Sequence, residues 1–308
     1  MSMEKKMKDT IKKSNKGKLS RRQKVRTAIQ LCWAAITNGY LIGFLEGKIY
    51  QGPIKNVCLP GLNCYSCPGS LGSCPIGALQ ATLGDRNYKF AFYVIGTLMI
   101  FGAFFGRIVC GFLCPFGLIQ DLLYMIPVPR SWRKRKLIPG DRVLKYLKYV
   151  MLVLLCIVLP MTVLDVIGDG KPWFCAYVCP AGTFMGGVPL IATNPLLRDA
   201  LGWLWAWKLS ILIGIFVLSL LFYRPFCRYL CPLGAIYGCF NPIAIQRYKK
   251  VEAKCIDCGK CKVACPFDID PSKNPNSVDC IRCGRCLDSC PTSAIESTGL
   301  LEKIKRKS

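Results

Sequence analysis

The sequence predicts an α-helical integral membrane protein of about four transmembrane helices in two repeated helix pairs, followed by a small C-terminal α+β module that is rich in cysteine. Three observations predict this architecture. The chain of 308 residues is 52% hydrophobic, which is high for a soluble protein. A cysteine-containing segment recurs 117 residues further along the chain, and eight more cysteines crowd into residues 255–290.

Four apolar stretches supply the predicted spans, and each approaches the roughly 20 residues that a helix needs to cross a bilayer. They cover residues 27–45, 90–106, 147–167 and 203–223. Three tryptophans bunch at the start of the fourth stretch, as in the aromatic belt of a membrane interface. They are Trp203, Trp205 and Trp207.

Lysine and arginine residues decide the orientation. Eleven of them lie in the first 26 residues, and the segments after the second and fourth stretches are also strongly basic. The other two loops hold few, so the positive-inside rule places both termini in the cytoplasm, in a multi-pass protein of the cytoplasmic (inner) membrane. The N-terminal tail lacks the apolar core of a signal peptide. We expect it to contact membrane lipid rather than nucleic acid, because an apolar stretch follows it directly.

The domain organisation follows from these boundaries. We predict a basic cytoplasmic tail (residues 1–26), a first membrane repeat (27–126) and a basic cytoplasmic loop (127–144). A second membrane repeat (145–248), the cysteine-rich module (249–298) and a second basic tail (299–308) follow.

The cysteines indicate metal ligation. There are 21 of them, an odd number, and many precede proline in short repeated spacings, unlike the even pairing of a secreted disulfide scaffold. The chain has no histidine, which excludes histidine-ligated haem or zinc, Rieske clusters and histidine bases. We therefore expect no haem.

The repeat places cysteine pairs at matched depths. Residues 104–119 read FFGRIVCGFLCPFGLI, and residues 221–236 read LFYRPFCRYLCPLGAI. The phrase Cys-Pro-x-Gly also begins at Cys74 and Cys179, so two copies are expected at each side of the membrane. Three cysteines without partner spacing are interpreted as small apolar fillers, namely Cys32, Cys156 and Cys239.

Proline after each cysteine suits the first turn of a helix. The free N–H groups of that helix would face a negatively charged thiolate cluster, with Arg107 and Arg224 nearby. A 4Fe-4S cluster needs four thiolates. The inner side offers one such set, made of Cys110, Cys114, Cys227 and Cys231.

The outer side offers six candidates for four positions. These are Cys58, Cys64, Cys67, Cys74, Cys175 and Cys179. The spacing favours the last three together with either Cys64 or Cys67, and the two remaining thiols would form a disulfide or bind nothing.

Residues 255–291 hold two consecutive runs of the form Cys-x2-Cys-x2-Cys-x3-Cys-Pro. This is the signature of a bacterial two-cluster ferredoxin, in which the fourth cysteine of each run binds the other cluster. The two ligand sets would be Cys255, Cys258, Cys261 and Cys290, and Cys280, Cys283, Cys286 and Cys265. Gly259 and Gly284 lie in the ligand loops, where the backbone must turn tightly. Structural zinc, which also uses sites of four cysteines, is the alternative. The Cys-x3-Cys-Pro that ends each run favours two 4Fe-4S clusters in this module instead. We expect one or two further 4Fe-4S clusters in the membrane domain.

On these motifs the chain resembles the membrane-bound 4Fe-4S polyferredoxins, whose signature is repeated Cys-x3-Cys-Pro plus two ferredoxin motifs. Their relatives include the quinol-dehydrogenase membrane component of periplasmic nitrate reductase systems and the membrane region of the nitrous oxide reductase maturation regulator. The resemblance covers residues 27–296 and implies electron transfer through or along a membrane. The fused flavin domain of larger relatives is not seen, so a separate external acceptor is expected.

The leading hypothesis is an iron–sulfur protein that passes electrons from a cytoplasmic donor to the outer side of the membrane. The donor would be a ferredoxin, flavodoxin or flavoprotein, and the acceptor an external flavin- or metal-containing protein. One alternative is a one-sided quinol dehydrogenase or metal-ion reductase component, and another is an iron–sulfur redox sensor or assembly scaffold. No catalytic residue is visible, so the chain is interpreted as an electron-transfer component of an oxidoreductase system.

Overall fold

The computed structural model describes residues 20–84, 91–128, 138–163, 170–199 and 201–298. The predicted C-terminal tail, most of the N-terminal tail, the centre of the predicted basic loop and the end of the third apolar stretch lie outside these residues.

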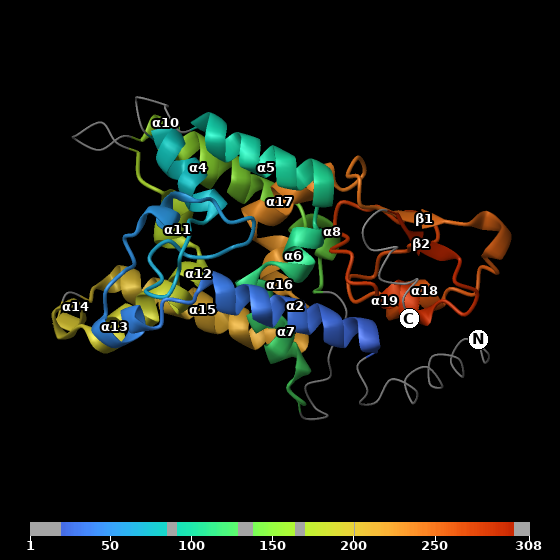
Figure 1. Ribbon diagram of the computed structural model, residues 1–308, viewed down its shortest axis with the longest axis horizontal. Helices are drawn as coiled ribbons and strands as arrows, with labels where there is room; N and C mark the ends of the chain where they lie inside the picture. The colour runs from blue at the N-terminus through green and yellow to red at the C-terminus, as the bar shows by residue number, and fades with distance from the viewer. Residues whose placement is uncertain (1–19, 85–90, 129–137, 164–169, 200, 299–308) are drawn as a thin grey trace.

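The described residues are mostly helical, and most helices lie in an elongated bundle (Figure 1). The first part of the bundle contains α2 (Arg21–Thr37), α3 (Ile42–Glu46), α4 (Pro75–Gly84), α5 (Ala91–Phe105), α6 (Ile108–Phe112) and α7 (Pro115–Met125). The second part contains α8 (Asp141–Leu144), α9 (Leu147–Val150), the π-helix η2 (Met151–Val158), α10 (Leu159–Thr162), α11 (Trp173–Tyr177), α12 (Pro180–Gly182), the π-helix η3 (Thr183–Gly187), α13 (Val188–Thr193), α14 (Pro195–Asp199), α15 (Trp203–Leu221), α16 (Pro225–Tyr229) and α17 (Pro232–Phe240). Short 3₁₀ turns cover Pro53–Asn56 and Glu252–Lys254.

Two helices of the described chain are long and apolar enough to cross a membrane, judged by length and composition. One is the continuous helix Asp141–Thr162, formed by α8, α9, η2 and α10, and the other is α15. They correspond to the third and fourth predicted stretches. The second stretch contains a shorter apolar helix, Phe92–Phe105.

The first predicted stretch differs from the observed helix. The helix α2 begins at Arg21, six residues before the expected boundary, because the Ser20 hydroxyl caps it by accepting a hydrogen bond from the N–H of Gln23 (3.3 Å). It ends at Thr37, where Asn38 and Gly39 interrupt it before the short α3. Residues assigned to the basic tail therefore form the first turns of a packed helix.

A small α+β module occupies one end of the molecule, opposite α13 and α14 (Figure 1). The strands β1 (Tyr248–Lys250) and β2 (Ile295–Ser297) pair antiparallel. Two short helices, α18 (Lys260–Ala264) and α19 (Arg285–Ser289), lie between them in the chain. The glycines before these helices have φ values of +68° and +80°, which confirms the predicted tight turns at Gly259 and Gly284.

Buried polar contacts join the module to the bundle. The side-chain amide of Asn241 donates to the carbonyls of Ser277 (2.9 Å) and Cys280 (2.7 Å). Arg282 donates in the reverse direction, to the carbonyl of Asn241 (2.6 Å) and that of Phe105 (3.1 Å). These bonds anchor the loop that carries the first cysteine of the second run.

A buried carboxylate strengthens the same junction. Asp279 pairs with Lys148 and lies 3.6 Å from a guanidinium nitrogen of Arg107. Burial by itself raises the pKa of Asp279, but the two cations outweigh burial and hold that pKa below its usual value. The carboxylate is therefore ionised and binds the bundle to the module.

Candidate iron–sulfur sites

At each Cys-Pro-x-Gly motif, a helix begins directly after the cysteine. Cys114, Cys179 and Cys231 are N-cap residues, and each sulfur accepts a hydrogen bond from the glycine N–H three residues later (3.3–3.4 Å). Proline fills the first helical position, where no N–H is needed. The backbone of Gly77 lies at the equivalent position near the sulfur of Cys74. The helix ends thus aim N–H groups at three of these four thiols.

The four inner cysteines come together. Cys110, Cys114, Cys227 and Cys231 are each at most 5% exposed. The thiol of Cys231 interacts electrostatically with the other three, which come from both repeats. The set expected from the sequence therefore shares one buried region.

The two repeats exchange arginines at this inner set. Arg107 donates to the carbonyl of Cys227 (2.9 Å), and Arg224 donates to the carbonyl of Cys110. Each arginine lies three residues before a cysteine of its own repeat, but its side chain donates to the carbonyl of a cysteine of the other repeat. Both side chains are fully buried, and their guanidinium groups carry positive charge beside the thiols.

A buried carboxylate holds one of these arginines. Asp121 accepts two hydrogen bonds from Arg224 and one from Arg26 of α2 (2.9 Å). All three side chains are at most 6% exposed. One carboxylate therefore links α2, α7 and the start of α16.

Two glutamines were missed by the sequence analysis. Gln120 donates to the sulfur of Cys227 (3.2 Å), and Gln80 donates to the sulfur of Cys175 (3.3 Å). Each glutamine follows a Cys-Pro-x-Gly cysteine by six residues, in CPFGLIQ and CPIGALQ. That shared spacing is the signal that could have revealed them. In both sites the glutamine of the first repeat reaches a sulfur of the second repeat.

At the outer side the structure brings together four of the six candidates. The thiol of Cys175 interacts electrostatically with those of Cys179, Cys74 and Cys64. A Cβ built on Gly182 would lie 3.7 Å from the sulfur of Cys64 and 3.9 Å from that of Cys179. Of the two alternatives left open by the spacing, Cys64 rather than Cys67 thus lies against the second repeat.

The remaining cysteines divide into two groups. Cys58 and Cys67 lie at the edge of the outer set, where Cys58 interacts with Cys74 and Cys67 with Cys64. Cys156, interpreted as a filler, is fully buried in the π-helix η2 and interacts with Cys179 and Cys74. The other two predicted fillers are exposed at the surface, namely Cys32 and Cys239.

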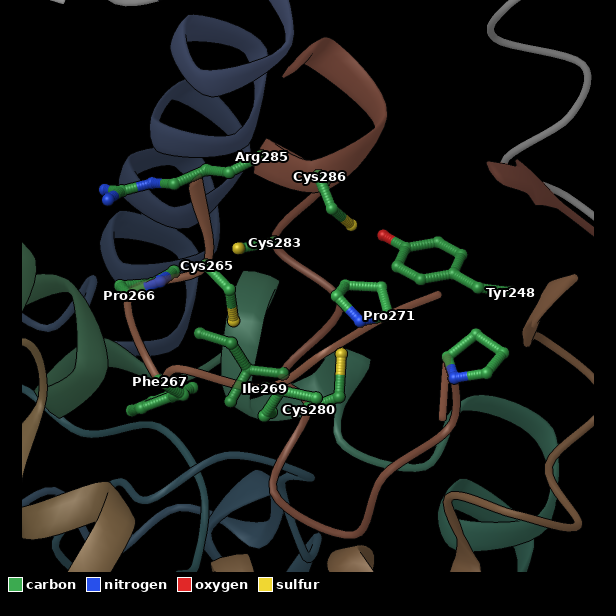
Figure 2. A pocket seen from close by; sticks show the side chains of 13 residues that line it. Tyr248, Cys265, Pro266, Phe267, Ile269, Pro271, Cys280, Cys283, Arg285 and Cys286 are labelled. Carbon is green, nitrogen blue, oxygen red and sulfur yellow. The ribbon is translucent and has the colours of Figure 1, made fainter. Parts of the chain in front are cut away.

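The α+β module contains two cavities that separate its eight cysteines into the predicted sets. The first is lined by Cys265, Cys280, Cys283 and Cys286. Figure 2 shows their four sulfur atoms facing a common space. The second is lined by Cys255, Cys258, Cys261 and Cys290. In each cavity three cysteines come from one run and the fourth from the other run.

These thiols fit iron–sulfur clusters. Within the described part of the chain, no three cysteine or carboxylate side chains converge where they could hold a single metal ion. The thiols instead surround cavities, as ligands of a multi-iron cluster would, and backbone N–H groups are directed at the sulfurs. Burial raises the pKa of Cys280 to about 12, so iron must displace the thiol proton there.

Comparison with known families agrees with this geometry. A family described as a 4Fe-4S binding domain matches residues 89–138, 147–193 and 203–249, and each match contains one Cys-x3-Cys-Pro pair. A second family with the same description matches residues 276–296. No solved structure matches the chain.

Three relatives illustrate the similarity. A protein of Methanocaldococcus jannaschii is 31% identical over 196 residues, which cover 62% of this chain and 69% of the relative. The methylamine utilization ferredoxin-type protein MauN of Methylobacillus flagellatus is 29% identical, covering 62% of this chain and 60% of the relative. The ferredoxin-type protein NapH of Haemophilus influenzae is also 29% identical, covering 60% and 57%. The chain thus spans less than two thirds of the last two relatives. With cysteine sets, family matches and relatives in agreement, the chain belongs to the ferredoxin-type 4Fe-4S polyferredoxin family and is an iron–sulfur electron-transfer protein.

Proposed function

We propose that the chain passes electrons across a membrane, from a cytoplasmic donor to an external acceptor, through four 4Fe-4S clusters. The observation that carries this proposal is the arrangement of four cysteine sets in one continuous series. The series begins in the module with the Cys255 set, which is Cys255, Cys258, Cys261 and Cys290, and continues with the Cys265 set, which is Cys265, Cys280, Cys283 and Cys286. The inner set and then the outer set follow. A bound 4Fe-4S cluster supplies a site that accepts and releases one electron.

Short pieces of chain connect the module to the inner set. Between the module and the inner set, Ile281 follows the ligand Cys280 and packs on the chain beside Cys110. A Cβ built on Gly111 would lie 2.5 Å from the carbonyl oxygen of Ile281, so only glycine permits this approach. The ring of Phe267, close to Cys265, packs against Tyr223 at a centroid distance of 5.5 Å. These contacts pack the module directly against the bundle.

The outward faces of the helices support a membrane location. Within the 18-residue apolar stretch of each candidate span, only 17% is buried inside the protein. Large apolar side chains on α5 and α15, such as Phe92 (84% exposed) and Trp203 (81%), point away from the core. The core helix of a soluble protein would be mostly buried, whereas lipid covers such faces at no cost. We infer four spans, with α2 and α5 completing the two helix pairs.

The residues around the sets have distinct roles in this proposal. The cysteines would hold iron, while the helix N–H groups, Gln80 and Gln120 stabilise the charged sulfurs. Arg107 and Arg224 add positive charge at the inner set. The Cys255 set is the most exposed of the four, so we place the donor there, and we place the acceptor at the outer loops.

Proteoliposomes test the direction and the path. With protein oriented so that the module faces outward, a reductant that cannot cross the membrane should reduce a flavin or ferric acceptor trapped inside. The Cys175→Ser variant should abolish this transfer and leave the module reducible. Transfer that stops at the membrane would contradict the conduit and favour a one-sided surface reaction. Cluster reduction without sustained flux would favour a sensor.

A further inference from the structure

An outer loop enters the space between the two membrane cysteine sets. The sequence places residues 60–64 outside the membrane, but the structure packs them in the core. The hydroxyl of Tyr237 donates to the carbonyl of Pro60 (3.0 Å). A Cβ built on Gly61 would collide with the carbonyl oxygen of Leu113 and lie 3.2 Å from the Cα of Cys114. The loop therefore lies directly on the chain of the inner set.

Two successive residues of this loop approach different sets. The backbone of Leu62 lies near the thiol of Cys114, an inner cysteine. The backbone of Asn63 lies near the thiol of Cys74, an outer cysteine. Both residues are buried, at 2% and 1% exposure, and the next residue, Cys64, belongs to the outer set. Within three residues the chain thus passes from one set to the other.

Tyr237 holds the loop in this position. It lies on α17, shortly after the inner cysteine Cys231, and is fully buried. It interacts electrostatically with two inner thiols, those of Cys110 and Cys114, and with two outer thiols, those of Cys58 and Cys74. Tyr237 therefore lies near thiols of the inner set and near Cys74 of the outer set.

We propose that residues 60–64 form the electronic bridge between the two membrane clusters, with Tyr237 as the positioning residue. The inference rests on the proposed function. Electronic coupling decays less through bonds and hydrogen bonds than through space. Only the backbone of residues 61–64 lies between the Cα of Cys114, against which Gly61 packs, and Cys64. The inner and outer cysteine sets are therefore joined by a short piece of chain, although the sequence predicts them at opposite sides of the membrane.

EPR spectroscopy of the fully reduced protein tests the bridge. Protein purified anaerobically in detergent should contain about sixteen irons, as expected for four 4Fe-4S clusters. Two adjacent paramagnetic clusters interact magnetically, so the inner signal should be broadened or split. The Cys175→Ser variant should lose about four irons, and the inner signal should then sharpen.

Two substitutions address the loop without removing a ligand. Gly61→Ala displaces the loop from Leu113, and Tyr237→Phe removes the bond to Pro60. Both should keep the full iron content but lose or narrow the magnetic splitting. Gly96→Ala is the matched control, because a Cβ there meets nothing within 4 Å. Tyr229→Phe is the second control, because it removes a hydroxyl bond to Asp141 at another buried site.

The outcomes separate the two proposals. A full iron content without splitting in the unaltered protein overturns the bridge and leaves the proposed function standing. Splitting that persists in both Gly61→Ala and Tyr237→Phe also overturns it. If Gly61→Ala fails to hold iron, the milder Tyr237→Phe decides. About eight irons in the unaltered protein would confine the clusters to the module and overturn the proposed function and the bridge together.

Discussion

At the scale of single residues, the membrane sets depend on donors that come from the opposite repeat. Gln120 and Arg224 sit on different repeats, and each serves a cysteine of the other one. Hydrogen bonds to cluster sulfurs stabilise the more negative, reduced state and so raise the reduction potential. Gln120 would therefore adjust the reduction potential of a cluster bound there, whereas Arg224 donates to a backbone carbonyl and would act through its positive charge.

Gln120→Leu removes one such bond while keeping a similar side-chain volume. We expect the potential of the inner cluster to fall by roughly 40 mV, since about 1 kcal/mol corresponds to that shift for one electron. Redox titration followed by EPR measures it. Gln80→Leu is the matched control and should shift the outer cluster alone. Equal shifts of both clusters in either variant would refute the assignment.

Asp121→Ala leaves Arg224 and Arg26 buried without their carboxylate. Breaking a buried ion pair from one side costs about 3–5 kcal/mol, so we expect a marked fall in the unfolding temperature. Thermal unfolding in detergent measures this. Asp199→Ala, at an exposed position on α14, should change stability by less than about 0.5 kcal/mol. Similar effects of the two substitutions would show that the buried network contributes little.

At the scale of elements, the chain repeatedly starts a helix at a ligand. In α7, α12 and α17 the N-cap is a cysteine, proline follows it, and glycine directs its N–H at the sulfur. Glycine is also needed for close packing, because a Cβ on Gly117 would lie 3.0 Å from Arg224 and one on Gly234 would lie 3.1 Å from Arg107. Loops of the module dock on α6 and on the end of α17, where a Cβ built on Gly111 or Gly238 would lie within 2.9 Å of the carbonyl oxygen of Ile281 or Val278.

Asn241→Ala should loosen that docking. Its side chain donates to two carbonyls of the module and accepts a bond from the N–H of Arg107 (2.9 Å). We expect hydrogen exchange in residues 277–282 to rise by roughly tenfold or more, since leaving buried groups unpaired costs about 1–3 kcal/mol each. Asn194→Ala, which breaks a bond to Gly47 far from the module, is the control. Unchanged exchange would show that the other contacts suffice.

At the scale of the whole molecule, four cysteine sets account for 16 of the 21 cysteines. Three of the sets, namely the inner set and the two sets of the module, contain the cysteines that the two-fold repeat and the two ferredoxin runs predict. The outer set takes Cys64 from a loop rather than from a second Cys-x3-Cys-Pro pair. Cys58 and Cys67 remain beside it without a place in any set of four.

Single substitutions test this division. Cys64→Ser should remove about four irons, as expected for the loss of one cluster, because each cluster needs four thiolates. Cys58→Ser and Cys67→Ser should retain all of them. Iron and acid-labile sulfide analysis measures the difference. A loss of iron in Cys67→Ser with no loss in Cys64→Ser would reverse the assignment.

The sequence alone was sufficient for the module. Its ligand spacings are local, so the separation of eight cysteines into two sets and the positive φ at Gly259 and Gly284 could be predicted. The inner set was also predictable, because the repeat brings equivalent positions together. Two of the predicted spans appear as helices of membrane length, whereas α2 and α5, in the other two stretches, have 17 and 15 residues.

Tertiary structure alone decided what depends on packing between distant segments. Six outer cysteines are candidates for four positions, and only the fold places Cys64 beside Cys74, Cys175 and Cys179. Tyr237, more than 170 residues away, bonds the loop at Pro60 and holds it inward. The exchanged bonds of Arg107, Arg224 and the two glutamines likewise join residues more than 90 positions apart. Local sequence governs how a helix begins at a sulfur, but which sulfurs share a site depends on how buried surfaces fit together, and that fit is a property of the whole chain.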